Sequence, residues 1–143
     1  MLRRVQLLLA ALWGGLLLSI AGLVMPSAFA VLERSQAVLL AGRIFSLEAQ
    51  ISLGVALVLM MAERRMARDG AGPAASAEFL LPAGALFSTV AGYYVLQPMM
   101  QAALAGAPGP SAMALHGMSM GFFALKTGLV LALAWRLSRR PSS

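Results

Sequence analysis

Apolar residues fill most of this chain in long stretches, and short polar segments interrupt them. Each stretch has about 20 residues or more, the length that an α-helix needs to cross the hydrocarbon core of a bilayer. The connections are short, as between neighbouring helices of opposite direction. The pattern therefore predicts an all-α membrane protein, an antiparallel four-helix transmembrane bundle with a single domain over residues 1–143. The predicted spans are about residues 5–32, 37–61, 78–100 and 115–136.

The first apolar stretch allows a second interpretation. It follows a basic start, and Ala28-Phe29-Ala30 has the small residues of a signal-peptide cleavage site. The run from Val5 to Met25 is nevertheless long for a signal peptide and suits a membrane span. We therefore expect residues 1–30 to remain as the first helix, which Pro26 should kink or end.

The composition agrees with a membrane protein and excludes several functions. Hydrophobic residues make up 60% of the chain and charged residues 11%, whereas soluble domains are about a quarter charged. There is no cysteine, hence no disulfide, thiolate metal site or cysteine nucleophile. The net charge of +6 does not indicate nucleic-acid binding, because the arginines lie at the ends of apolar runs and not on one basic face.

The polar connections predict how the chain sits in the membrane. Residues 33–36 form a short turn, residues 62–77 a charged main loop that includes Gly72 and Pro73, and residues 101–111 an uncharged loop. Basic residues favour the cytoplasmic side. We therefore expect a multi-pass protein of the bacterial inner membrane, with both termini and the main loop in the cytoplasm. The arginines on that side are Arg3, Arg4, Arg64, Arg65, Arg68, Arg136, Arg139 and Arg140, against Arg34 on the other.

The fourth span contains the only lysine of the chain, Lys126. Helical spacing places it on one face with His116, Ser119 and Phe123. A cation in mid-membrane is costly, so this face should contact protein or water and not lipid.

Glu48 in the second span lies at a similar depth to Lys126, roughly 16 Å from the outer end at 1.5 Å per residue. We predict an intramembrane pair of Glu48 and Lys126. The pair is either a structural tether between helices or part of a transport path in which Glu48 accepts a proton.

Two further polar residues of the second span, Arg43 and Gln50, lie on another face of the same helix. Arg43 falls near the outer interface, where its side chain can extend to lipid headgroups or pair with Glu33. The alternative is an anion or headgroup contact at the outer mouth of the bundle.

Methionines gather at the outer end together with the only histidine. Met113, His116 and Met120 share a helical face, and Met25, Met99, Met100 and Met118 lie near the same level. Thioether and imidazole groups suit copper(I). The alternative is that methionine fills gaps in apolar packing. Copper is accordingly the only cofactor that we consider, with His116, Met113 and Met120 as its ligands.

Four short motifs resemble a known family. They are Pro26-Ser27-Ala28-Phe29-Ala30, Ala41-Gly42-Arg43-Ile44-Phe45, Tyr94-Val95-Leu96-Gln97-Pro98 and Leu115-His116-Gly117-Met118-Ser119. The chain resembles the bacterial domain-of-unknown-function family whose eukaryotic relative is transmembrane protein 205, a membrane protein associated with cisplatin resistance. The resemblance covers the whole chain and implies a four-helix membrane bundle. It implies no particular activity and no functional residue.

The sequence lacks the motifs of common enzyme classes: HExxH, the phosphate-binding GxxxxGK[ST] loop and GxSxG are all absent. We therefore expect no catalytic residue and a non-enzymatic role in the bilayer, as a transporter-like module or as a membrane subunit of an assembly. The partners would be lipid and possible further copies or other membrane subunits. The alternative function is soft-metal binding or resistance at the outer face.

Overall fold

The computed structural model describes residues 1–70 and 76–139, and these residues form helices and turns without any strand. Four helical rods are long and apolar enough to cross a membrane. The predicted all-α four-helix bundle is therefore confirmed. Kinks divide two of the rods, so the helices are α1 (Leu2–Ser19), η1 (Ile20–Val24), α2 (Met25–Val31), α3 (Arg34–Arg68), α4 (Ala77–Thr89), η2 (Val90–Val95), α5 (Leu96–Leu104) and α6 (Ala112–Ser138).

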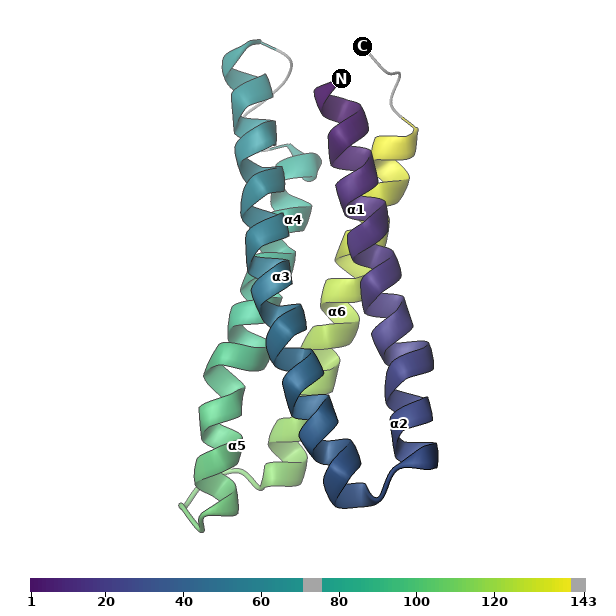
Figure 1. Ribbon diagram of the computed structural model, residues 1–143. Helices are drawn as coiled ribbons and strands as arrows, with labels where there is room; N and C mark the ends of the chain where they lie inside the picture. The colour runs from purple at the N-terminus through teal and green to yellow at the C-terminus, as the bar shows by residue number, and fades with distance from the viewer. Residues whose placement is uncertain (71–75, 140–143) are drawn as a thin grey trace.

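The rods run alternately up and down (Figure 1). The start of α1, the end of α3, the start of α4 and the end of α6 lie together at what we call the terminal end. The α2–α3 and α5–α6 connections lie at the opposite end, the turn end. The α4 helix packs against α3 and α6, and α1 packs against α6 and α3. As a result α3 and α6 stand at opposite corners of the bundle, and both run from the turn end to the terminal end.

The hydrophobic core fills the half of the bundle nearer the terminal end. Close helix packing is possible there because small residues face bulky ones: a Cβ atom at Gly84 would lie 3.0 Å from Leu129 of α6. The core seals this half of the bundle, and its buried members are Ala10, Trp13, Leu17, Ala56, Leu59, Ala85, Val130, Leu133 and Leu137.

All four rods are longer than the apolar stretches predict. The α3 helix begins at Arg34 and ends at Arg68, and α5 ends at Leu104, so the prediction was wrong in placing residues 34–36, 62–68 and 101–104 in loops. The physical reason is that residues 62–68 contain only Ala, Glu, Arg and Met, which are strong helix formers despite their charge. Gly72, Pro73 and Arg140 of the sequence predictions lie outside the described residues.

Two segments of π-helix interrupt the rods, and each precedes a proline. The η1 segment ends shortly before Pro26, and η2 ends shortly before Pro98. Proline lacks the amide proton and crowds the carbonyl one turn earlier, and a widened turn accommodates both effects. Pro26 therefore changes the local winding, but the helix continues to Val31 and does not end.

Candidate functional site

A cavity of about 660 Å³ occupies the half of the bundle nearer the turn end. Its walls come from α3, from the end of α4 with η2 and α5, and from α6, and Phe29 of α2 also reaches it. Arg34, Leu104 and Ala112 lie at the turn-end mouth, because they are close to the ends of their helices. Glu48 and Lys126 also line the cavity and lie deepest along their helices, so they form its base.

Glu48 and Lys126 form an ion pair at this base. Lys126 Nζ lies 2.5 Å from Glu48 Oε1, and both side chains are almost fully buried. The structure thus brings together two predicted residues from opposite corners of the bundle. They meet because parallel helices carry them at the same depth.

A hydrogen-bond chain extends the ion pair to a third helix. Ser52 Oγ donates to the same oxygen, Glu48 Oε1, and Trp13 Nε1 of α1 donates to Ser52 Oγ at 2.9 Å. Glu48 and Ser52 are four residues apart, so they share the buried face of α3. The carboxylate is thereby held by α1, α3 and α6 at once, which fixes its position in the bundle.

An aromatic pair lies one helical turn from the ion pair, toward the turn end. Phe45 of α3 and Phe123 of α6 meet edge to face, with ring centroids 5.6 Å apart. Lys126 Nζ lies 5.3 Å from the centroid of Phe123, which is within the range of a cation–π interaction. The rings therefore screen part of the ion pair from the wider, outer part of the cavity.

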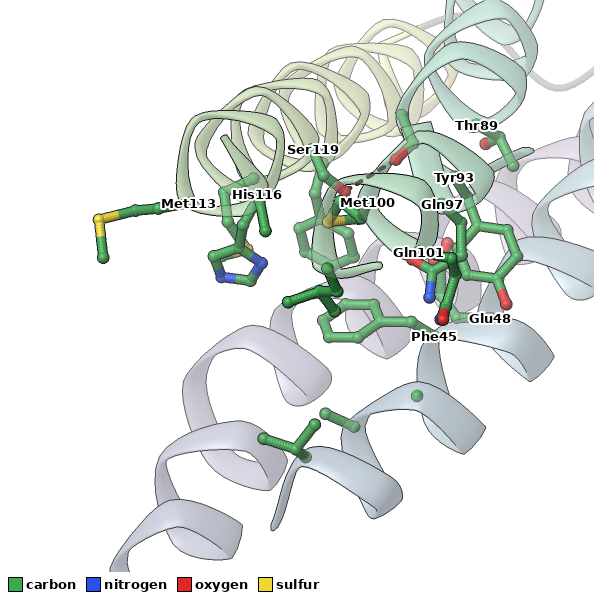
Figure 2. Close-up of a pocket in the computed structure, with 18 of the residues that line it drawn as sticks. Phe45, Glu48, Thr89, Tyr93, Gln97, Met100, Gln101, Met113, His116 and Ser119 are labelled. Atoms are coloured by element: carbon green, nitrogen blue, oxygen red, sulfur yellow. Dashed lines mark hydrogen bonds between the residues drawn. The ribbon is translucent and has the colours of Figure 1, made fainter. Parts of the chain in front are cut away.

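The wall between η2 and α6 depends on a close approach at Gly92. A Cβ atom there would lie 2.6 Å from Phe122 Cβ, so only glycine fits. Ser119 Oγ of α6 donates to the Gly92 carbonyl oxygen at 2.8 Å, which is the dashed line in Figure 2. This contact fixes η2 against α6, beside the polar side chains of Tyr93 and Gln97 that line the cavity.

The predicted copper ligands reach the cavity in part. Met113, His116 and Met120 all line it. Figure 2 shows the His116 ring beside the cavity, whereas the thioether of Met113 extends away from it, and Met113 is 84% exposed. Met100 is a further methionine of the lining. In the described part of the chain, no cluster of three or more His, Cys, Asp or Glu side chains could hold a metal.

Arg43 and Gln50 do not belong to this cavity. Both side chains are exposed on the surface of α3, whereas Glu48 is buried on another face of the same helix. Their positions suit contact with the surroundings of the bundle and not with a ligand in the cavity.

Two carboxylates at the terminal end are buried, although the sequence pattern did not predict it. Glu63 of α3 accepts hydrogen bonds from Arg3 Nη1 and Gln6 Nε2 of α1, each at 3.0 Å, and from Ser76 Oγ at 3.1 Å. Spacing could have revealed it, because Glu63 continues the buried stripe of α3 that contains Glu48 and Ser52.

The second carboxylate is Glu78 of α4, which accepts from Arg136 Nε of α6 at 3.2 Å. Together with the Glu63 contacts, this ion pair ties the four rods to one another at the terminal end. Arg3 and Arg136 were predicted only to mark the cytoplasmic side, and in the structure they also connect helices.

Comparison with known proteins gives a family. Residues 7–107, the greater part of the chain, match a family described as Domain of unknown function (DUF4149). The chain belongs to the DUF4149 family. The DUF4149 match includes Glu48 and the α3 and α5 walls of the cavity, and it ends before α6, which carries Lys126 and His116. No curated protein and no solved structure matches the chain. The relation to transmembrane protein 205 stays a prediction.

Proposed function

We propose that this DUF4149 protein is a non-enzymatic, transporter-like module of the bacterial inner membrane that takes a small solute into its cavity. One observation carries the proposal: a cavity of about 660 Å³ leads from the turn end to a buried ion pair. Its volume lies within the range of ligand sites, about 300–1,000 Å³. Apolar walls with a few polar groups, such as Gln97 and Gln101, suit a small and partly apolar solute.

The ion pair offers a means to couple solute entry to a proton. Glu48 is the proton acceptor in this proposal, and Lys126 is its partner in the ion pair while the cavity is empty. Proton uptake by Glu48 would release Lys126 and loosen the contact between α3 and α6. The core seals the terminal half of the bundle, so passage of the solute also requires a movement of α4 and α5. The π-helical segment η2 between them would be the hinge of this movement.

Proton flux into reconstituted vesicles tests the proposal when a panel of small, partly apolar solutes is supplied outside, because the proposal couples proton uptake to solute entry. Vesicles with an internal pH dye receive a potassium diffusion potential, and acidification is followed over time. We expect wild type to acidify faster than empty vesicles and Glu48→Gln to match empty vesicles. Glu33→Gln is the matched control, because it makes the same chemical change at an exposed residue just before α3. Wild-type flux equal to that of empty vesicles, or flux that persists in Glu48→Gln, contradicts the proposal.

The role of a membrane subunit has support of its own on α6. Gly117, Gly121 and Gly128 lie on its exposed surface, and a Cβ atom at any of them would meet no atom within 4 Å. Small residues on a lipid-facing helix allow another helix to approach closely. Stable co-purification of a partner chain in mild detergent, lost in Gly121→Leu, is the expected result for a subunit.

Copper(I) binding is the alternative from another class. It is favoured by one observation, the common cavity of His116, Met100 and Met120, whose soft side chains suit that ion. A copper(I) competition titration should then give a weaker affinity for His116→Ala than for wild type. Equal affinities would leave the methionines as packing residues.

A further inference from the structure

A second hollow lies at the terminal end, on the outside of the bundle where α3 ends and α4 begins. It has a volume of about 740 Å³ and is separate from the cavity of the proposed function. Its lining divides into an apolar part and a charged part, and we call it the arginine groove. The lining residues are Leu57, Met60, Met61, Phe79, Arg64, Arg65, Arg68 and Asp69.

The charges of the arginine groove are unbalanced. Three arginines face one carboxylate, that of Asp69, which leaves a net charge of +2. In the described ranges, the ion pairs join Arg3 to Glu63, Lys126 to Glu48 and Arg136 to Glu78, so none of them neutralises a groove arginine. The terminal end thus has two kinds of arginine, those that tie helices together and those that line the groove.

The side chain of Arg64 is already held in place. Its guanidinium carbon lies 5.1 Å from the centroid of the Phe79 ring, across the junction of α3 and α4. A guanidinium that lies over an aromatic ring keeps the N–H groups of its own plane available for an anion. Arg64 is therefore oriented for binding before any ligand arrives.

The apolar part of the groove lies directly beneath the arginines. Leu57, Met61, Arg64 and Arg68 follow one another at spacings of four, three and four residues, so they share one face of α3. Leu57 is 48% exposed and Met61 63% exposed. This face thus presents an apolar strip toward the middle of the span and a basic cluster at its end.

We infer that the arginine groove binds one anionic phospholipid. The phosphate accepts hydrogen bonds from Arg64 and Arg68, which match its oxygens in bidentate geometry, and an acyl chain lies along Leu57 and Met61. A free phosphate would use only the arginines, and a lipid without phosphate only the apolar strip. A zwitterionic phospholipid would add a quaternary ammonium, which the arginines repel. Basic pockets between helices at the membrane surface are a recognised site for acidic headgroups. The inference does not depend on the proposed transport function.

Native mass spectrometry of the detergent-purified full chain tests the inference. The probes are phosphatidylglycerol, phosphatidylcholine with the same acyl chains, and inorganic phosphate. The groove variant is Arg64→Gln/Arg68→Gln. The control is Arg4→Gln/Arg139→Gln, which removes the same charge from exposed residues of the same end outside the groove. Asp69→Asn is a third variant, which raises the charge of the groove without removing any arginine.

We expect one tightly bound phosphatidylglycerol on wild type, at least tenfold weaker binding in the groove variant, and unchanged binding in the control. Asp69→Asn removes the one negative charge of the groove and should bind the lipid more tightly than wild type. This gain of binding tests the inference even if the groove variant misfolds. Equal loss in the groove and control variants would show general attraction to a basic surface and overturn the inference. Equal binding of phosphatidylcholine, or displacement of the lipid by inorganic phosphate, would also overturn it.

Discussion

The Glu48–Lys126 pair gives a prediction whose size follows from its burial. Lys126→Met leaves the Glu48 carboxylate buried, with the Ser52 hydroxyl as a neutral donor. Glu48→Gln leaves the Lys126 ammonium buried with an amide oxygen and the Phe123 ring. Loss of one partner from a buried pair costs about 3–5 kcal/mol, because a charge remains without its counter-charge. Each single change should therefore lower the free energy of unfolding by about 3 kcal/mol.

The double change removes both charges, and the Gln side chain at position 48 can still bond Ser52. If the two sites were independent, the two single effects of about 3 kcal/mol each would sum to about 6 kcal/mol in the double variant. Because no charge is stranded, we expect the double variant to lose no more than about 3 kcal/mol. The coupling energy between the sites is then about 3 kcal/mol, at the upper end of measured couplings between contacting residues.

Unfolding in mixed detergent micelles, followed by helicity and by tryptophan fluorescence, measures these energies. Trp13 donates to Ser52 in the same network, so tryptophan fluorescence reports on the region once the exposed Trp135 is replaced by phenylalanine in every variant. Arg43→Gln is the control, since it removes an exposed charge from the same helix and should leave the transition unchanged. Single effects that add in the double variant would refute the pairing, because independent sites show no coupling.

Other predictions concern packing and topology. Gly92→Ala should destabilise the bundle by about 2 kcal/mol in the same assay, because the added methyl group overpacks against Phe122. The control Gly117→Ala should not destabilise it, since a Cβ atom there meets no atom within 4 Å. Equal effects of the two changes would contradict the close approach of Gly92 to Phe122. Trp13→Phe should cost about 1 kcal/mol more in the wild-type background than in the Ser52→Ala background, the worth of its hydrogen bond to Ser52; equal costs in the two backgrounds would mean that packing alone is lost. Reporter fusions after Asp69 and at Ser143 should be cytoplasmic and a fusion after Ser111 external, and a mature chain that begins at Val31 would contradict this topology.

The sequence was sufficient for the four rods because membrane helices must be long and apolar, and few other structures satisfy that requirement. It also placed Glu48 and Lys126 at one depth, since residue counting along two parallel helices gives a common level. It did not reveal that Glu63 and Glu78 are buried, because charged residues near a loop look solvent-exposed until the partner helix is known. Pro26 predicted a kink in the first rod, but the contact of Gly92 with Phe122 depends on which helix lies beside η2, and the pattern of one segment does not give its neighbour.

The paired labelling of two glycine positions tests the central claim, that the cavity is open to solutes from the turn end. The chain has no cysteine, so single cysteines can be introduced at Gly42, which lines the cavity, and at Gly121, which is exposed on α6 outside it. The two lie at similar distances along their helices from the ion pair, and a Cβ atom added at either would meet no atom within 4 Å. A charged, membrane-impermeant thiol reagent added from the side of the turn end should modify Gly42→Cys rapidly and Gly121→Cys hardly at all. Equal rates at the two positions, or no reaction of Gly42→Cys, would contradict an open cavity.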